Sequence, residues 1–112
     1  MTWIPLESEV QIDKIIADSE QKPQVIFKHS TRCSISSMAK NRLTKKNAPE
    51  AIDFYYLDLI QFRKLSNRIA SDFKVTHQSP QILIIHNGKC IYHESHSGIT
   101  MEEIEEVVSQ HN

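Results

Sequence analysis

The chain contains little glycine and cysteine, and it has no long hydrophobic run. Each of these two residue types occurs twice among 112 residues, which excludes a glycine-rich repeat protein and a disulfide-stapled miniprotein. The longest aliphatic run covers four residues, 82–85, whereas a membrane helix needs roughly 18. The N-terminus lacks the basic and apolar regions of an export signal. We therefore expect a cytoplasmic protein with no membrane contact.

Neither sign of charge is in excess. Thirteen Lys and Arg residues stand against fourteen Asp and Glu residues, so the formal net charge is -1. Such a chain has no overall basic field to attract nucleic acid, and we expect no nucleic-acid partner. The apolar share of 39% and the charged share of 24% are ordinary for globular proteins. We predict one domain over residues 1–112, and we expect a monomer.

Hydrophobic periodicity predicts four helices and four strands. Apolar residues recur at helical spacing in residues 8–20, from position 33 to before Pro49, in residues 60–73, and from position 100 onward. Short runs rich in β-branched and aromatic residues predict the strands, at 25–27, 54–57, 82–85 and 90–92. The predicted order is α-β-α-β-α-β-β-α.

Local signals fix several element ends. Ser8 with Gln11 and Thr100 with Glu103 have the spacing of capping boxes, which mark helix starts. Asn87-Gly88 lies between the last two predicted strands and favours a two-residue hairpin, because both central residues must adopt positive φ. Strands joined by about twenty residues through a helix should be parallel with a right-handed crossover. The chain therefore predicts a mixed four-stranded sheet with helices on both faces.

Several short segments of the chain carry a family resemblance. They are Phe27-Lys28-His29-Ser30-Thr31, the Cys33-x-Ile35-Ser36 core, His77-x-Ser79-Pro80-Gln81 and Asn87-Gly88-Lys89. Together they resemble the monothiol bacilliredoxin family of thioredoxin-like proteins, and the resemblance spans nearly the whole chain. One departure is Ser34, where the family has a proline directly after the cysteine. Its absence should loosen the helix start slightly without removing the backbone amides there.

The resemblance implies a thioredoxin-like α/β fold with strand order 4-3-1-2 and strand 3 antiparallel. It also implies a thiol-disulfide oxidoreductase that acts on client proteins capped by a low-molecular-weight thiol. The small thiol implied is bacillithiol, acting as a co-substrate, and no other cofactor is expected. Neither composition nor periodicity indicates this substrate.

Cys33 and Ser36 are the predicted catalytic residues, with Cys33 as the nucleophile. A thiolate, not a thiol, attacks a disulfide, so its surroundings should favour the charged form. We expect the free N–H groups of Ile35 and Ser36, the Ser36 hydroxyl and the charge of Arg32 to point at the sulfur. Arg32 is also a candidate substrate-binding residue. The alternative reading makes Cys33 a small buried apolar residue, Arg32 a solvated charge and Ser36 an ordinary helix-start residue.

Position 36 is serine, so Cys33 has no resolving partner one helical turn away. The expected mechanism therefore stops at a mixed disulfide between Cys33 and the small thiol. Cys90 belongs to the last predicted strand, at the sheet edge, and we interpret it as structural.

Ser79-Pro80 precedes the hairpin, where thioredoxin-like proteins place a cis proline beside the cysteine. The resemblance therefore implies a cis bond, with Ser79 and Pro80 as substrate-binding residues whose backbone pairs with an extended substrate. Otherwise Pro80 would simply begin a strand.

Six histidines raise the question of a metal site. We expect none, because Cys90 and His93 should face opposite sides of a strand and no fourth ligand has zinc-like spacing. His29 and His77 would tune the thiol, contact the substrate or lie in solvent. Two other functions stay open: a monothiol iron-sulfur carrier, which the bulk of Ser34 and Ile35 disfavours, and a non-catalytic stress or interaction module.

Overall fold

The computed structural model describes residues 1–111 and contains five strands and four α-helices in that part of the chain. In chain order the elements are β1 (Trp3–Pro5), α1 (Glu9–Asp18), β2 (Gln24–His29), α2 (Ser34–Thr44), β3 (Phe54–Asp58), α3 (Arg63–Asp72), β4 (Gln81–His86), β5 (Lys89–Ser95), a 3-10 turn η1 (His96–Gly98) and α4 (Met101–His111). No helix of residues 1–111 is both long enough and apolar enough to cross a bilayer.

The sheet has the strand order β1-β3-β2-β4-β5. β2 pairs in parallel with β3, whereas β4 is antiparallel to both β2 and β5. The four predicted strands thus occupy the predicted order, and the thioredoxin-like fold is confirmed. The count of four was wrong by one, because residues 3–5 add an edge strand parallel to β3. A three-residue run that includes Pro5 shows no periodicity, and Pro is tolerated in a strand only at such an edge.

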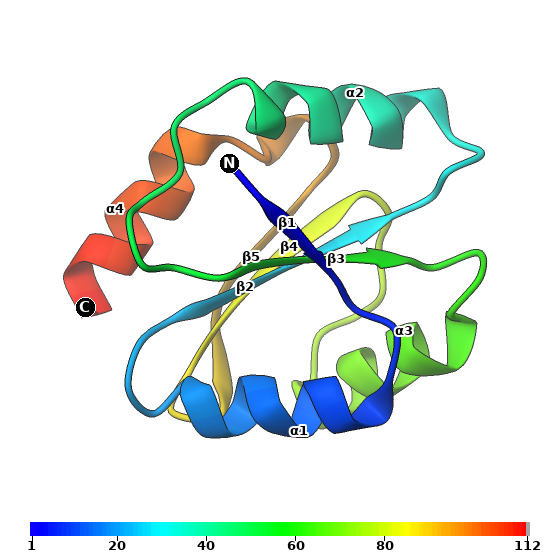
Figure 1. The fold of residues 1–112 in the computed structure, drawn as a ribbon. Coiled ribbons are helices and arrows are strands. Elements are labelled where there is room, and N and C mark those ends of the chain that lie inside the picture. Colours follow the sequence, from blue (N-terminus) through cyan, green and yellow to red (C-terminus); the bar gives the residue numbers. More distant parts are fainter. Residues whose placement is uncertain (112) are drawn as a thin grey trace.

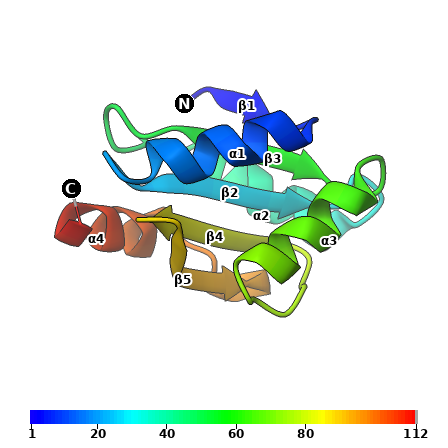
Figure 2. The ribbon, with the colours of Figure 1, turned by 90° about the horizontal axis from the view of Figure 1, so that it is seen from below.

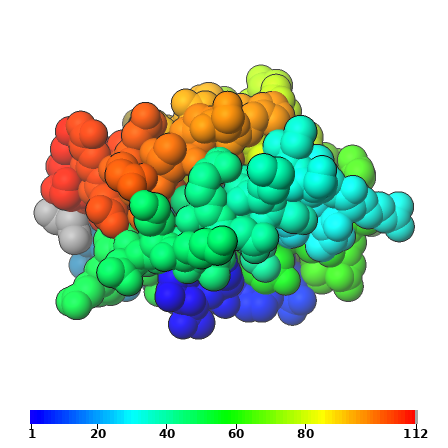
Figure 3. All heavy atoms as spheres, turned by 90° about the horizontal axis from the view of Figure 1, so that it is seen from above, coloured from blue at the N-terminus to red at the C-terminus, as the bar shows by residue number. Residues whose placement is uncertain are grey.

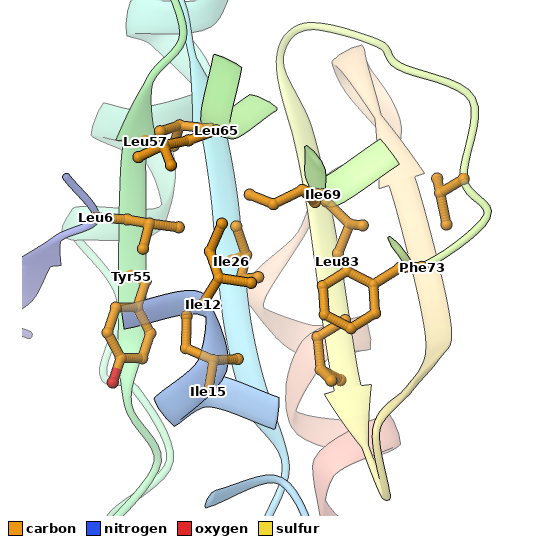
Figure 4. Packing of buried hydrophobic residues seen from close by; sticks show 12 residues of the cluster. Leu6, Ile12, Ile15, Ile26, Tyr55, Leu57, Leu65, Ile69, Phe73 and Leu83 are labelled. Atoms are coloured by element: carbon orange, nitrogen blue, oxygen red, sulfur yellow. The ribbon is translucent and has the colours of Figure 1, made fainter. Parts of the chain in front are cut away.

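Two helices cover each face of the sheet: α1 and α3 lie on one side, α2 and α4 on the other (Figures 1 and 2). β2 is central, so its residues are buried on both faces and alternate between two cores. Ile26 belongs to the core under α1 and α3, which Figure 4 shows with Leu65, Ile69 and Leu83. Phe27 belongs to the core under α2 and α4. The site described below lies beyond the end of this strand.

The predicted element ends hold in most places. Ser8 forms the capping box with Gln11, and the Glu103 N–H donates to the Thr100 hydroxyl at 3.3 Å. Asn87 and Gly88 both have positive φ, 53° and 74°, as the tight hairpin requires. α3 begins at Arg63, later than the predicted position 60, because residues 58–62 first form a turn at the end of β3.

Candidate functional site

Cys33 lies at the N-terminus of α2, directly after the turn that follows β2. The Cys33 N–H donates to the Ser30 carbonyl at 3.1 Å and closes this turn. Cys33 is the N-cap residue with extended backbone angles, and α2 proper begins at Ser34. The cysteine is half-buried and belongs to neither apolar core. The reading of Cys33 as a core residue is therefore wrong.

The start of α2 offers backbone N–H groups to an anion. The first N–H groups of a helix have no intrahelical partner, and those of Ile35 and Ser36 are among them. The helix dipole adds a partial positive charge at the same end. We expected these amides to hold the sulfur, yet Cys33 forms no side-chain capping hydrogen bond. The donors stand next to the sulfur in sequence but do not bind it in this structure.

The Ser36 side chain is fully buried and hydrogen-bonded away from the thiol. Its oxygen accepts from the Ser30 N–H at 2.9 Å and lies 2.9 Å from His29 Nδ1. No hydrogen bond joins it to the Cys33 sulfur in the part of the chain that the structure describes. The expectation that this hydroxyl points at the sulfur is therefore corrected. With two bonds to the residues before the turn, Ser36 fixes the loop that carries Cys33.

His29 is buried rather than solvated, and its ring extends the aromatic packing of the α2 face. The ring stacks on Phe27 with centroids 5.9 Å apart and meets Tyr56 edge-on. Burial lowers the pKa of His29, and the positive charge of Lys40 acts in the same direction. This shift favours the neutral imidazole, whose Nδ1 can share a hydrogen bond with Ser36.

Ser79-Pro80 lies beside the same turn. The peptide bond is cis, as the resemblance implied. Lys28 near the end of β2 pairs with Gln81, the first residue of β4, so Ser79-Pro80 and the turn that carries Cys33 lie at the same end of the sheet. The Pro80 carbonyl accepts from the His96 N–H at 3.1 Å. In residues 1–111 neither backbone group of Ser79 forms a hydrogen bond, and its buried hydroxyl has no partner.

Arg32 directly precedes Cys33 in the turn. Its side chain is exposed, and it forms no ion pair within residues 1–111. The structure therefore brings Arg32, Cys33 and the Ser79-Pro80 bond to one end of the sheet, beyond the last residue of β2 and the first of β4. The buried Ser36 hydroxyl holds the turn that carries Arg32 and Cys33 through its hydrogen bonds to Ser30 and His29.

A buried lysine near this end of the sheet was not anticipated from the sequence. Lys28 is completely inaccessible, and its ammonium group donates to the Ser66 carbonyl at 3.1 Å. His77 Nδ1 lies 3.2 Å from Lys28 Nζ and 3.3 Å from the Ser66 hydroxyl. Burial lowers the pKa of Lys28 from 10.5 to about 8. The pKa of His77 is also lowered, by burial and by the charges of Lys28 and Arg63.

Cys90 lies at the opposite end of the sheet from Cys33. It pairs with Ile85, which pairs with Gln24 at the start of β2, whereas Cys33 follows the end of that strand. Six strand residues separate the two ends, which is about 20 Å at ~3.3 Å per residue. A disulfide needs Cα atoms within about 7 Å, so Cys90 cannot resolve a bond at Cys33 in this fold.

The surroundings of Cys90 fit a structural role. The side chain packs against the core under α1 and α3, and burial raises the pKa of the Cys90 thiol. The expectation that Cys90 and His93 face opposite sides of the strand is wrong. A bulge between Ile84 and Ile85 makes Cys90 pair with Ile85 and His93 with Leu83, and these two β4 residues face the same core. His93 itself is exposed. Within residues 1–111, no three His, Cys, Asp or Glu side chains converge as metal ligands would.

Comparison with known proteins agrees with this geometry. The family described as monothiol bacilliredoxin BrxC matches residues 4–104. A solved structure described as a candidate oxidoreductase with a thioredoxin fold is 33% identical, covers 93% of this chain and 91% of its own, and superposes with a TM-score of 0.81. Thioredoxin from Malassezia sympodialis is 18% identical over 99% of this chain and 90% of its own, with a TM-score of 0.71. Thioredoxin from Trypanosoma brucei brucei is 20% identical over 96% and 92%, also with a TM-score of 0.71.

Proposed function

The chain belongs to the monothiol bacilliredoxin family, and from this premise we propose that Cys33 removes a small thiol from client proteins by thiol-disulfide exchange. A thiol redox role is supported by the family and by its thioredoxin-fold oxidoreductase neighbour. The finer proposal concerns the substrate, which is a mixed disulfide between a protein cysteine and a low-molecular-weight thiol. Bacillithiol is the small thiol that the family description suggests.

The proposed reaction moves one disulfide bond without net oxidation. The Cys33 thiolate attacks the sulfur of the small thiol, a bond forms between these two sulfurs, and the bond to the client sulfur breaks. The client leaves as a thiolate and takes up a proton. A second thiol then attacks the small-thiol sulfur and forms a disulfide with it, and the bond to Cys33 breaks so that the cysteine is free again. The unpaired N–H groups of Ile35 and Ser36 would stabilise negative charge on the attacking sulfur.

One observation carries this proposal: the half-buried Cys33 lies at the start of α2, and neither position 36 nor Cys90 can supply a resolving thiol. Position 36 holds a buried serine whose oxygen is already bonded to Ser30 and His29. The other cysteine, Cys90, is at the far end of the sheet. No other cysteine of this chain can therefore attack a mixed disulfide on Cys33. This fits a protein that takes the small thiol onto Cys33 and is then reduced by a thiol from another molecule.

Ser79, Pro80 and Arg32 are proposed to hold the client. The N–H and C=O of Ser79 are free of other bonds within residues 1–111, so an extended client segment can pair with them as an added strand. The cis bond at Pro80 belongs to this loop. Arg32 directly precedes Cys33 in the chain, and its exposed guanidinium can contact carboxylates of the cap or of the client.

The test uses a protein whose one cysteine is capped with bacillithiol, and in parallel the same protein capped with glutathione or with cysteine. Mass spectrometry follows the cap, which is expected to leave the client and appear on Cys33. Cys33→Ser should abolish transfer, and the matched variant Cys90→Ser should retain it. Transfer that persists in Cys33→Ser, or a Cys33–Cys90 disulfide as the product, would overturn the proposal. Equal transfer of every cap would contradict the choice of bacillithiol alone.

A further inference from the structure

The solvent face of α2 carries a row of apolar and cationic side chains that begins at the thiol. Ile35, Met38, Arg42 and Lys45 follow one another at intervals of three or four residues, so they share one face of the helix. Arg32 continues the row just before Cys33. We call these five residues the α2 row. The space-filling view shows α2 uncovered along its length, with α4 beside it (Figure 3).

The apolar part of the row is unusually exposed. Ile35 is 56% and Met38 is 63% exposed, although both are large hydrophobic side chains. Beside Met38 lies a surface hollow of about 410 Å³, and its other lining residues are Asn41, Arg42, Lys45 and Lys46. Exposed apolar side chains with a polar rim are typical of protein interaction sites. The row thus combines an apolar anchor with positive charge.

The charge of the row is not matched by nearby acids on its own segment. Residues 21–49 contain seven Lys and Arg residues and no Asp or Glu, which leaves six Lys and Arg against fourteen Asp and Glu elsewhere. In residues 1–111, Arg32 and Lys45 form no ion pair. Lys46 pairs with Glu102 of α4 at 3.4 Å, and Arg42 donates to the Ile99 carbonyl at 3.1 Å. The uncompensated charge lies at both ends of the row.

We propose that the α2 row is a docking surface for client segments that carry Asp or Glu and an apolar residue close to the capped cysteine. This inference rests on the proposed exchange function and names the class of client it selects. From Cys33 to Lys45 the helix advances about 18 Å at ~1.5 Å per residue. An extended client segment covers that length in about five or six residues. Client carboxylates within this distance of the capped cysteine can form ion pairs with the cations of the α2 row, and the apolar client residue can pack against Met38.

Three synthetic peptides of about ten residues test the inference, each with one bacillithiol-capped cysteine. The first has two Asp and one Leu within five residues of the cysteine, the second has Asn in place of Asp, and the third has Lys. The rate of cap transfer to Cys33 is expected to be roughly tenfold higher for the acidic peptide than for the neutral one at low salt. At ~1 M salt, where the Debye length falls to about 3 Å, the preference should nearly vanish.

Lys45→Glu should remove or reverse the preference for the acidic peptide, whereas Lys64→Glu on the opposite face of the sheet should leave it unchanged. Circular dichroism establishes that both variants are folded, and Met38→Gln provides a second variant that should slow the acidic and neutral peptides alike. Equal rates for all three peptides would overturn the docking surface and leave the exchange function intact. A concentration-dependent dimer lost in Lys45→Glu would assign the row to a second copy, and would also overturn it. If no cap moves from any peptide, the exchange function itself fails.

Discussion

Replacing the buried Lys28 by methionine is expected to stabilise the protein at neutral pH and to lose that advantage as the pH rises. Lys28 is fully inaccessible, and in residues 1–111 no carboxylate forms an ion pair with it. Its polar contacts are the Ser66 carbonyl and His77. A buried ammonium without a counter-ion disfavours the folded state, because the charged form loses its hydration.

The magnitude follows from the two pKa values of Lys28. The amine has a pKa of about 8 in the folded protein and an ordinary value of 10.5 when exposed. Since each unit corresponds to about 1.4 kcal/mol, the charge costs the folded state about 3 kcal/mol below pH 8. Methionine removes this cost but also removes two polar contacts, worth about 1 kcal/mol. The net stabilisation of Lys28→Met at pH 7 is therefore about 2 kcal/mol.

The pH dependence has a definite sign. Between pH 8 and 10.5 the unfolded chain binds more protons at Lys28 than the folded chain, so the free energy of unfolding of the natural protein rises with pH. The variant lacks this rise. The advantage of Lys28→Met should therefore shrink by roughly 2 to 3 kcal/mol between pH 7 and 10. Taking the difference between the two proteins cancels the contributions of the titratable groups that both proteins share.

Urea unfolding at several pH values measures this difference directly. Lys64→Met is the matched control, because Lys64 is an exposed lysine on α3 and should show no such pH dependence. Parallel stability curves for the natural protein and Lys28→Met from pH 7 to 10 would refute the reasoning. A variant that is less stable than the natural protein at pH 7 would refute it as well.

Three further outcomes are expected. Ser36→Ala should lower the free energy of unfolding by about 1 to 3 kcal/mol, because the Ser30 N–H loses its buried acceptor, and a loss near zero in urea unfolding would contradict the role of Ser36 in the loop. Iodoacetamide at pH 7 should label Cys33 well before Cys90, whose thiol pKa is raised by burial, and mass mapping that finds the reverse order would contradict the site. Ser8→Ala should cost about 1 kcal/mol and Ser8→Asp much less, and equal losses would show that the cap at α1 contributes nothing.

The order of the strands could be predicted because it depends on signals that lie close together in the chain. Asn87-Gly88 joins two apolar runs directly, and the helical segments between the other strands enforce parallel crossovers. The end of β2 was harder to predict from the sequence. Apolar pattern alone stops that strand at Phe27, yet Lys28 and His29 continue it. Their burial depends on partners far along the chain, such as the Ser66 carbonyl 38 residues away, which no local pattern reveals.

The position of Cys33 was predictable, whereas the contacts around it were not. A cysteine after a buried strand and before an amphipathic helix has only the helix start available to it, and the structure places it there. The direction of the Ser36 side chain is a different matter. A serine one turn into a helix can turn its hydroxyl toward the residue that caps the helix or toward the preceding strand. The Ser36 hydroxyl points toward the strand, because His29 Nδ1 and the Ser30 N–H would otherwise be buried polar groups without a partner.

The orientation of the Ser36 side chain links the stability of the loop that carries Cys33 to the chemistry proposed for that loop. Position 36 is where a second cysteine would have to stand to attack a disulfide at Cys33, since residues three apart on a helix are neighbours. The same position must also supply a strong acceptor to the buried Ser30 N–H, and a thiol is a weak acceptor. A serine at position 36 accepts the hydrogen bond from the Ser30 N–H, and it leaves Cys33 without a resolving thiol. The monothiol character of the site is therefore not only the absence of one sulfur but part of how the loop carrying the other sulfur is held in place.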